Sequence, residues 1–219
     1  MQAKTNKVPI TDILFDLGRV LVPIDWNLAY TRLASHLPDR LRLLMETDRE
    51  AFQNLFLDSA IELEMGRLEF GRFHKIVTHA LETRISLEEF HHIWCDIFRL
   101  DTRMVRLGQS LSRTYGTWLV SNTSEAHYQW IVTKFPEIVF YRDAALSYRL
   151  GVMKPAAEYY RKALSLFGVN PASCVFIDDL SENVEGAVRA GMIGIVYEGT
   201  DQLLEKLHKI GVAVSDLTE

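Results

Sequence analysis

The sequence predicts an α/β protein in which a parallel sheet of about five strands is interrupted, after its first strand, by a long helical segment. Five compact apolar runs are typical of buried strands; they lie at residues 11–15, 117–120, 138–140, 173–177 and 193–196. Helical patterns separate the last four runs, as expected of a sheet covered on both faces with right-handed crossovers. The helical segment follows the first run directly.

Residues 26–101 are predicted to form the helical segment because leucines, aromatics and charges recur there at spacings of three and four. The chain has 219 residues, a length that suits one large domain or a core with an insertion. The helical pattern favours a core with an insertion. We expect residues 1–25 and 102–219 to form the core and residues 26–101 to form a lid. Aromatic residues at helical spacing, such as Trp26 and Trp94, are expected to pack inside this lid.

The charge balance argues against nucleic acid and membrane as partners. The chain carries 24 Lys and Arg against 29 Asp and Glu, a net charge of −5, and it has no basic stripe. Its longest apolar runs fall far short of the roughly 18 residues that cross a bilayer, and residues 1–7 lack the apolar centre of a signal peptide. Cys95 and Cys174 show no metal-ligand spacing, which suggests buried thiols in a reducing cytosol. We expect a cytoplasmic protein with small-molecule partners; no pattern predicts its oligomeric state.

Polar residues that suit phosphate or metal chemistry follow four of the predicted strands; they are Asp16, Ser121, Asn122, Lys154, Asp178 and Asp179. Ligands of open α/β sheets bind at the carboxyl ends of the strands, so we expect these side chains to converge. Carboxylates that meet at one point repel each other unless a cation neutralises them, and oxygen ligands suit Mg²⁺. The sequence therefore predicts a Mg²⁺ site, with Ser121 and Lys154 holding the remaining oxygens of a phosphate.

Four segments in this order resemble the motifs of the haloacid dehalogenase-like (HAD) hydrolase superfamily; they are residues 15–21, 120–123, 151–155 and 176–184. The resemblance covers essentially the whole chain. It implies a Rossmann-like α/β core with a four-helix-bundle cap inserted after the first motif. It also implies a hydrolase that acts on a small phosphorylated metabolite.

The resemblance assigns a role to each matching residue. Asp16 matches the nucleophile that attacks phosphorus and becomes an aspartyl phosphate. Ser121, with Asn122 beside it, matches the group that binds the phosphoryl oxygens, and Lys154 matches the lysine that neutralises their charge. The implied metal ligands are Asp16, the backbone carbonyl of Gly18 and one member of the acidic pair. Of that pair, the resemblance favours Asp179 as the direct ligand and Asp178 as a partner that acts through water or indirectly.

Gly18 departs from the pattern of most phosphatases in this superfamily, which have a second Asp there as general acid/base. Such catalysis contributes about 10²–10⁴-fold to the rate. A backbone carbonyl does not depend on its side chain, so the implied metal site is retained. The Gly variant resembles the branch that includes sugar-1-phosphate phosphatases and the N-terminal domains of epoxide hydrolases, which favours a phosphatase for a small sugar phosphate or a related metabolite.

Several alternatives stay open. Asp25 either supplies the missing proton or caps the first helix of the lid, and Arg19 contacts either the substrate or a carboxylate of the lid. A metal-independent haloacid dehalogenase also lacks the second Asp, although it has no use for the acidic pair Asp178 and Asp179. A protein without acid/base catalysis can also bind phosphorylated metabolites or a partner without turnover; the intact Asp16 argues against this.

Overall fold

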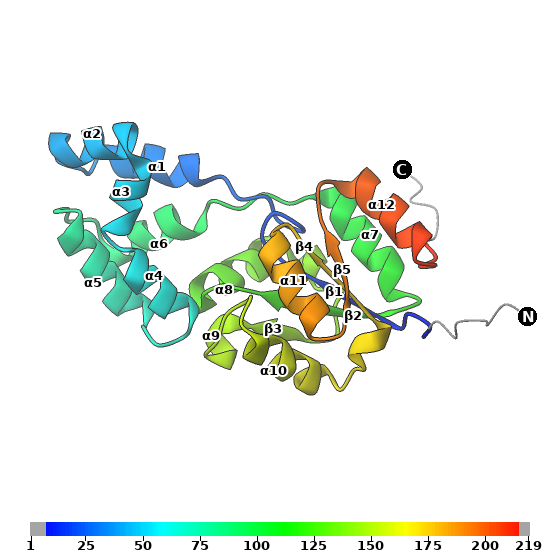
Figure 1. The fold of residues 1–219 in the computed structure, drawn as a ribbon. Helices are drawn as coiled ribbons and strands as arrows, with labels where there is room; N and C mark the ends of the chain where they lie inside the picture. The colour runs from blue at the N-terminus through cyan, green and yellow to red at the C-terminus, as the bar shows by residue number, and fades with distance from the viewer. Residues whose placement is uncertain (1–7, 215–219) are drawn as a thin grey trace, which may run out of the picture.

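The computed structural model describes residues 8–214, and these form a five-stranded parallel sheet with helices on both faces (Figure 1). The strands are β1 (Asp12–Phe15), β2 (Gly116–Ser121), β3 (Ala144–Leu146), β4 (Cys174–Asp178) and β5 (Ile193–Val196). The helices are α1 (Trp26–Ala34), α2 (Asp39–Thr47), α3 (Arg49–Asn54), α4 (Leu57–Glu64), α5 (Phe70–Ala80), α6 (Leu87–Cys95), α7 (Thr102–Ser112), α8 (Glu125–Lys134), α9 (Ser147–Leu150), α10 (Ala157–Phe167), α11 (Ser181–Arg189) and α12 (Thr200–Lys209), with short 3₁₀ helices η1 (Pro136–Ile138) and η2 (Pro171–Ser173). The predicted α/β, Rossmann-like fold is confirmed.

Strand β1 lies at the centre of the sheet, whose order is β3-β2-β1-β4-β5 with every neighbouring pair parallel. Phe15, the last residue of β1, is level with Leu119 of β2 and Ile177 of β4. The next residue, Asp16, donates its backbone N–H to the carbonyl oxygen of Ile177 at 2.9 Å. Since the chain crosses from β3 on one side of β1 to β4 on the other, this end of β1 is a topological switch point, where α/β proteins bind ligands.

The alternation of side chains along β1 builds two apolar layers. Ile13 and Phe15 pack on one face, in a cluster that includes the buried sides of α7, α8 and α12. Leu14 packs on the opposite face, in a cluster formed with α10 and α11. All three side chains are at most 1% exposed. Burial on both faces explains why the strands appear in the sequence as continuous apolar runs.

The third strand is the element that sequence analysis misplaced. Residues 138–140 were expected to form it, but Pro136 begins the 3₁₀ helix η1, and Phe140 instead packs edge-on against Phe15 with ring centroids 5.5 Å apart. The actual strand, β3, consists of Ala144, Ala145 and Leu146. Two of these three residues are alanines, which give only a weak apolar signal in the sequence. Helix α10 packs closely over the strand: the Tyr159 hydroxyl donates to the carbonyl oxygen of Ala145 at 2.6 Å.

Six helices, α1 to α6, fill the segment between β1 and α7 and lie to one side of the sheet in Figure 1. The helical insertion is thus present, divided into shorter helices than a bundle of four would have; for example, Asp48 ends α2 and caps α3. Two antiparallel connections join the insertion to the sheet. They are held together by the Ile24–Phe98 bridge and by a 2.8 Å bond from the Asp25 N–H to the Ile97 carbonyl.

Aromatic side chains pack against one another inside the insertion, as predicted. The rings of Trp94 and Phe73 lie 4.8 Å apart and those of Trp26 and Trp94 lie 5.4 Å apart. Cys95 and Cys174 are buried free thiols, in agreement with the sequence. Residues 8–214 include no helix with the length and apolar character of a membrane span.

Candidate active site

Three charged side chains meet at the carboxyl end of the central strands. The ammonium of Lys154 donates to Asp16 Oδ1 at 2.7 Å and to Asp178 Oδ2 at 2.6 Å. Its third bond goes to the carbonyl oxygen of Val120 in β2, at 3.0 Å. Lys154 is 5% exposed, Asp16 7% and Asp178 0%. The structure therefore brings together the predicted acid, lysine and acidic pair, from segments far apart in the sequence.

Burial controls the ionisation of this cluster. It raises the pKa of Asp16 to about 6, against the opposing effect of Lys154 and with a further increase from the Asp178 charge. Burial alone would lower the pKa of Lys154, but the carboxylates of Asp16 and Asp178 outweigh it and raise that pKa. Lys154 is thus a fixed cation that offsets part of the negative charge between two buried acids.

Asp178 is held rigidly by groups at the start of α11. The side-chain amide of Asn183 donates to both Asp178 oxygens, at 3.0 and 3.1 Å, and the N–H of Leu180 donates to Oδ1 at 2.9 Å. With Lys154 on Oδ2, both oxygens already have partners. The side chain of Asp178 is therefore fixed in place by Lys154, Asn183 and the backbone of Leu180. Sequence analysis included Asn183 in a motif but gave it no role.

Asp16, Asp178 and Asp179 can each present a carboxylate oxygen within 4.8 Å of the others, so their donor set fits a hard divalent cation. Asp179 is partly exposed and lies 3.6 Å from the guanidinium of Arg19. Its pKa is raised by burial and by the Asp178 charge, with Arg19 acting in the opposite direction. A cation would relieve the repulsion that raises this pKa. Of the acidic pair, Asp179 is the member with oxygens free of Lys154 and Asn183.

Gly18 lies in a tight loop directly after β1. The N–H of Val22 donates to the Leu17 carbonyl at 3.0 Å, and the N–H of Arg19 donates to the Val22 carbonyl at 2.9 Å. Arg19, with φ of 59°, adopts the left-handed conformation in this loop. A Cβ at Gly18 would meet only the side chain of Ile24, at 3.0 Å from its Cδ1. The glycine is therefore not required by its backbone conformation, and its carbonyl oxygen accepts no hydrogen bond within the described part of the chain.

Asn122 positions Lys154. Its Oδ1 accepts from the Lys154 N–H at 2.8 Å, and its Nδ2 donates to the Lys154 carbonyl at 3.0 Å. These two bonds fix the turn that carries the lysine. Lys154 lies three positions before the first residue of α10 and does not open that helix. The side chain of Asn122 is thus committed to the backbone of Lys154, which differs from the phosphate contact expected from the sequence.

Ser121 ends β2 with a hydroxyl that is free to bind a ligand. The residue is 2% exposed, and within residues 8–214 its hydroxyl makes one weak contact, 3.4 Å from the carbonyl oxygen of Asn122. Ser124, not Ser121 or Asn122, caps α8 by accepting from the His127 N–H. Such a hydroxyl at a sheet switch point is suited to donate to a phosphoryl oxygen.

Asp25 takes the capping position that was one of its two expected roles, whereas Arg19 contacts a carboxylate that was not among its expected partners. The carboxylate of Asp25 accepts from the N–H of Asn27 at 3.1 Å and caps α1. It therefore serves the first helix of the insertion, and the alternative in which Asp25 replaces the missing acid/base gains no support. Arg19 is 58% exposed and faces Asp179, not a carboxylate of the insertion.

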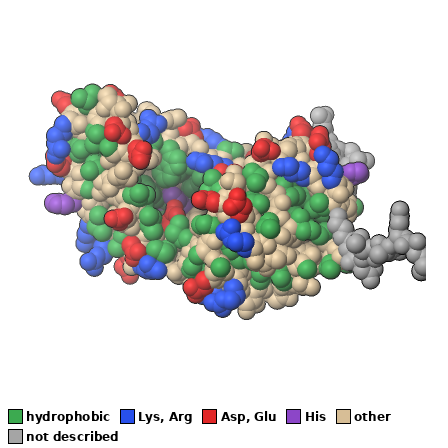
Figure 2. All heavy atoms as spheres, viewed as in Figure 1, with side chains coloured by type: hydrophobic (Ala, Val, Ile, Leu, Met, Phe, Trp, Pro, Cys, Tyr) green, Lys and Arg blue, Asp and Glu red, His purple; other side chains and the backbone are tan. Residues whose placement is uncertain are grey.

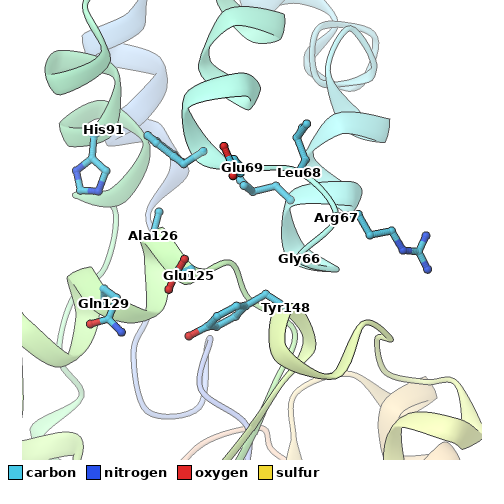
Figure 3. Close-up of a pocket in the computed structure, with 11 residues that line it drawn as sticks. Gly66, Arg67, Leu68, Glu69, His91, Glu125, Ala126, Gln129 and Tyr148 are labelled. Carbon is cyan, nitrogen blue, oxygen red and sulfur yellow. The ribbon is translucent and has the colours of Figure 1, made fainter.

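A pocket of about 650 Å³, separate from the charged cluster, lies where the connection from α4 to α5 meets the first turns of α8 and α9 (Figure 3). Contact is close there: a Cβ on Gly66 would lie 2.1 Å from the carbonyl oxygen of Tyr148. In Figure 3 Arg67 points away from the pocket, while Glu69 and Glu125 line it. Two carboxylates would repel a phosphate, and Arg67 does not point inward to offset them, so this pocket is not the phosphate site.

Comparisons with known proteins agree with this geometry. Over 186 residues the chain is 28% identical to a D-ribitol-5-phosphate phosphatase of Bacteroides thetaiotaomicron, covering 80% of this chain and 85% of that protein. It is 40% identical over 65 residues to a chloroplast flavin mononucleotide hydrolase of Arabidopsis thaliana, an alignment that spans 30% of this chain but only 26% of that protein.

A HAD family enzyme of B. thetaiotaomicron, solved with magnesium and inorganic phosphate, shares the fold with a TM-score of 0.74 at 23% identity, over 89% of this chain and 98% of that one. The family model for haloacid dehalogenase-like hydrolases matches residues 13–191, which include β1 except its first residue, the whole helical insertion, the acidic pair and Lys154. Of the two relatives described above, one is thus named as a phosphatase and the other as a flavin mononucleotide hydrolase. The chain therefore belongs to the haloacid dehalogenase-like hydrolase family.

Proposed function

We propose that the protein is a Mg²⁺-dependent phosphomonoesterase that acts through an aspartyl phosphate on Asp16. The observation that carries this proposal is the contact at the switch point between the Asp16 carboxylate and the Lys154 ammonium, 2.7 Å apart, beside two further carboxylates. A carboxylate at this position is a nucleophile next to a fixed positive charge, which is the arrangement that phosphoryl transfer requires.

In the first step an Asp16 carboxylate oxygen forms a bond to phosphorus as the bond from phosphorus to the ester oxygen breaks. The alcohol leaves with the bonding electrons and takes a proton from water. Lys154 and the Ser121 hydroxyl stabilise the charge on the phosphoryl oxygens. Water then attacks phosphorus, the bond to Asp16 breaks, and inorganic phosphate and the free carboxylate are released.

The residues that would hold Mg²⁺ are Asp16, the carbonyl oxygen of Gly18 and Asp179, with Asp178 fixing their surroundings through Lys154 and Asn183. The metal would supply positive charge that lets a phosphate dianion approach an acidic site. A net charge of −5 gives the protein no general attraction for such an anion, so the local cations must provide it.

We propose residues 26–101 as a cap that covers the site and selects the alcohol part of the substrate, and residues 1–25 and 102–219 as the catalytic core. The relatives support a small phosphorylated metabolite, with sugar phosphates and related esters as the expected class. The acidic trio favours this function over a metal-independent dehalogenase, which has no use for three carboxylates within 4.8 Å. A cytosolic location stays a prediction from the two free thiols.

The test is phosphate release from a panel of sugar phosphates and p-nitrophenyl phosphate, each measured with Mg²⁺ and with excess EDTA. We expect turnover with Mg²⁺ and a loss on the order of 10²-fold or more after chelation, because the three acids then face the phosphate without a neutralising cation. Absence of turnover for every ester, despite bound Mg²⁺, would contradict the phosphatase. Halide release from a 2-haloacid in EDTA would instead support the dehalogenase.

Gly18→Asp is expected to accelerate esters with poor leaving groups. The new carboxyl stands two residues after the nucleophile, and the flexible end of Ile24 can yield to the added Cβ. Because general acid catalysis contributes about 10²–10⁴-fold, kcat for an alkyl phosphate should rise at least about tenfold, and kcat for p-nitrophenyl phosphate much less. Gly18→Asn is the matched control, since it adds the same bulk without a titratable proton. Equal effects of the two variants on both esters would show that proton transfer does not limit the rate.

A further inference from the structure

The helical insertion contains a cavity of about 230 Å³. Its wall is formed by α1, α3, α4, α5 and α6 and is largely aromatic and aliphatic, with Trp26, Tyr30, Phe56, Phe90 and Trp94 as its rings and Glu64 as its carboxyl group. Hydrophobic side chains also gather in the hollow between the insertion and the sheet-bearing part of the molecule in Figure 2. The packed aromatic interior expected from the sequence therefore leaves room for a ligand.

Two contacts place this cavity wall against the loop that follows β2. The carbonyl oxygen of Glu64 accepts from the hydroxyl of Ser147 at 2.6 Å, and the same hydroxyl oxygen accepts from the N–H of Thr123 at 2.9 Å. Ser147 is fully buried, so this link is shielded from water. Glu64 is thus tied, through one side chain, to the residues directly after Ser121.

The second contact is made by His127 in the first turn of α8. Its ring stacks on that of Trp94 at 5.6 Å, lies 6.3 Å from that of Trp26, and its Nε2 is 3.0 Å from the carbonyl oxygen of Trp94. Burial lowers the pKa of His127 to about 4, so the ring is neutral and serves as a packing surface. The cavity wall therefore contacts α8 directly, through His127, and contacts the segment that joins Ser121 to α8 indirectly, through Ser147 and Thr123.

The polar groups in the wall suit a mostly apolar occupant. Burial raises the pKa of Glu64 to about 7, so in near-neutral solution much of it is a neutral acid that can donate or accept one hydrogen bond. The buried Nε1 of Trp94 has no hydrogen-bond partner within residues 8–214. A buried donor without a partner is costly, and a ligand oxygen would relieve that cost.

We propose that this cavity binds the alcohol part of the substrate and that the preferred phosphomonoester carries an aromatic or similarly flat apolar ring with a hydrogen-bonding substituent. The proposal rests on the phosphatase function above, but it replaces sugar phosphates, the class expected there from a relative, with ring-bearing phosphomonoesters. A cavity of roughly 150 Å³ lined by apolar side chains accepts benzene, so about 230 Å³ accommodates one substituted ring. An acyclic polyol would leave most of its hydroxyls without partners there.

The experiment compares benzyl phosphate with glycerol 1-phosphate, two primary alkyl esters whose alcohols differ little as leaving groups. We expect kcat/KM to favour benzyl phosphate on the order of 30-fold, the effect of burying one ring. Ala60→Leu, on the cavity wall one helical turn before Glu64, should reduce this preference at least about fivefold by filling the space. Ala126→Leu makes the same change in the larger pocket of Figure 3 and should leave the preference intact.

Acetyl phosphate, whose leaving group is too small to fill the cavity, separates the two proposals. If wild type hydrolyses acetyl phosphate but shows no preference for benzyl phosphate, or if Ala60→Leu leaves the preference unchanged, the cavity proposal is overturned while the phosphatase stands. If neither acetyl phosphate nor any ester of the panel is hydrolysed, the phosphatase fails. Quenching of Trp26 and Trp94 fluorescence by benzylphosphonate then still tests the cavity: we expect tighter binding than for ethylphosphonate, weakened in Ala60→Leu, and equal binding overturns it.

Discussion

Replacing Asp16 with Asn is expected to reduce phosphate release on the order of 10⁴-fold or more, because an amide cannot form the bond to phosphorus that the proposed first step requires. The loss should appear in kcat for every ester, whatever its alcohol. The fold should survive. The pKa of Asp16 is raised to about 6, so its ionised form is unfavourable in the buried site, and a neutral side chain of the same shape removes that cost. Thermal unfolding and phosphate-release assays measure the two effects separately.

Asp25→Asn is the matched control for this prediction. Asp25 precedes the insertion and caps α1, a role that Asn performs about as well as Asp. Activity should therefore stay within about twofold of wild type. Turnover of the Asp16→Asn variant at a rate close to that of wild type would show that another group is the nucleophile. A large loss in Asp25→Asn would restore the interpretation in which Asp25 supplies the missing proton.

The convergence of Asp16, Lys154 and Asp178 was predictable because each follows a strand with a strong apolar signal or a recognisable motif. Parallel strands end at one edge of the sheet, so side chains after them meet whatever the lengths of the connections. The same reasoning predicted the helical insertion from its spacing of three and four. These features depend on local pattern and simple topology, which a sequence displays directly.

The features that sequence analysis missed depend on packing between distant segments. Strand β3 is made of two alanines and a leucine; it pairs with β2, and Tyr159 of α10 bonds to its backbone. Asn122 pairs with the backbone of Lys154 across 32 positions, which no local spacing indicates. Asn183 did have a signal: an amide five positions after Asp178, in the first turn of a helix, is well placed to hold that carboxylate.

The buried carboxyl of Glu64 in the insertion could not be predicted from the sequence, for a different reason. Glu64 lies on an amphipathic helix, where a glutamate normally faces water. Its carboxyl is instead buried in the wall of a cavity, because its backbone carbonyl is anchored to Ser147 on the core. Only the packing of the insertion against the core makes this residue chemically unusual.

Lys154→Met is expected to cost both stability and activity, and it is the change with the largest expected effect on the fold. All three ammonium hydrogens are used, for Asp16, Asp178 and the Val120 carbonyl. Methionine has a similar length but leaves two buried carboxylates facing each other without a cation. Breaking a buried ion pair in this way typically destabilises a protein by about 3–5 kcal/mol. Urea unfolding at pH 7 measures this loss, and kcat should fall on the order of 10²-fold because the phosphoryl charge loses a partner.

The pH dependence of that loss and a surface control distinguish the buried cluster from a general effect of removing a lysine. The pKa of Asp16 in the folded protein, about 6, lies above its ordinary value of 3.8, so proton uptake by Asp16 below about pH 6 favours the folded state. The variant, in which no lysine neutralises this carboxylate, should gain more from that proton than wild type does, so the two stabilities should converge in acid. Lys134→Met removes a partly exposed ion pair with Asp96. Pairs of this kind contribute at most about 1 kcal/mol to the free energy of unfolding, so the loss should be small. A loss in Lys134→Met as large as in Lys154→Met, or one that does not shrink in acid, would contradict the view that Lys154 holds the site together by neutralising two buried acids.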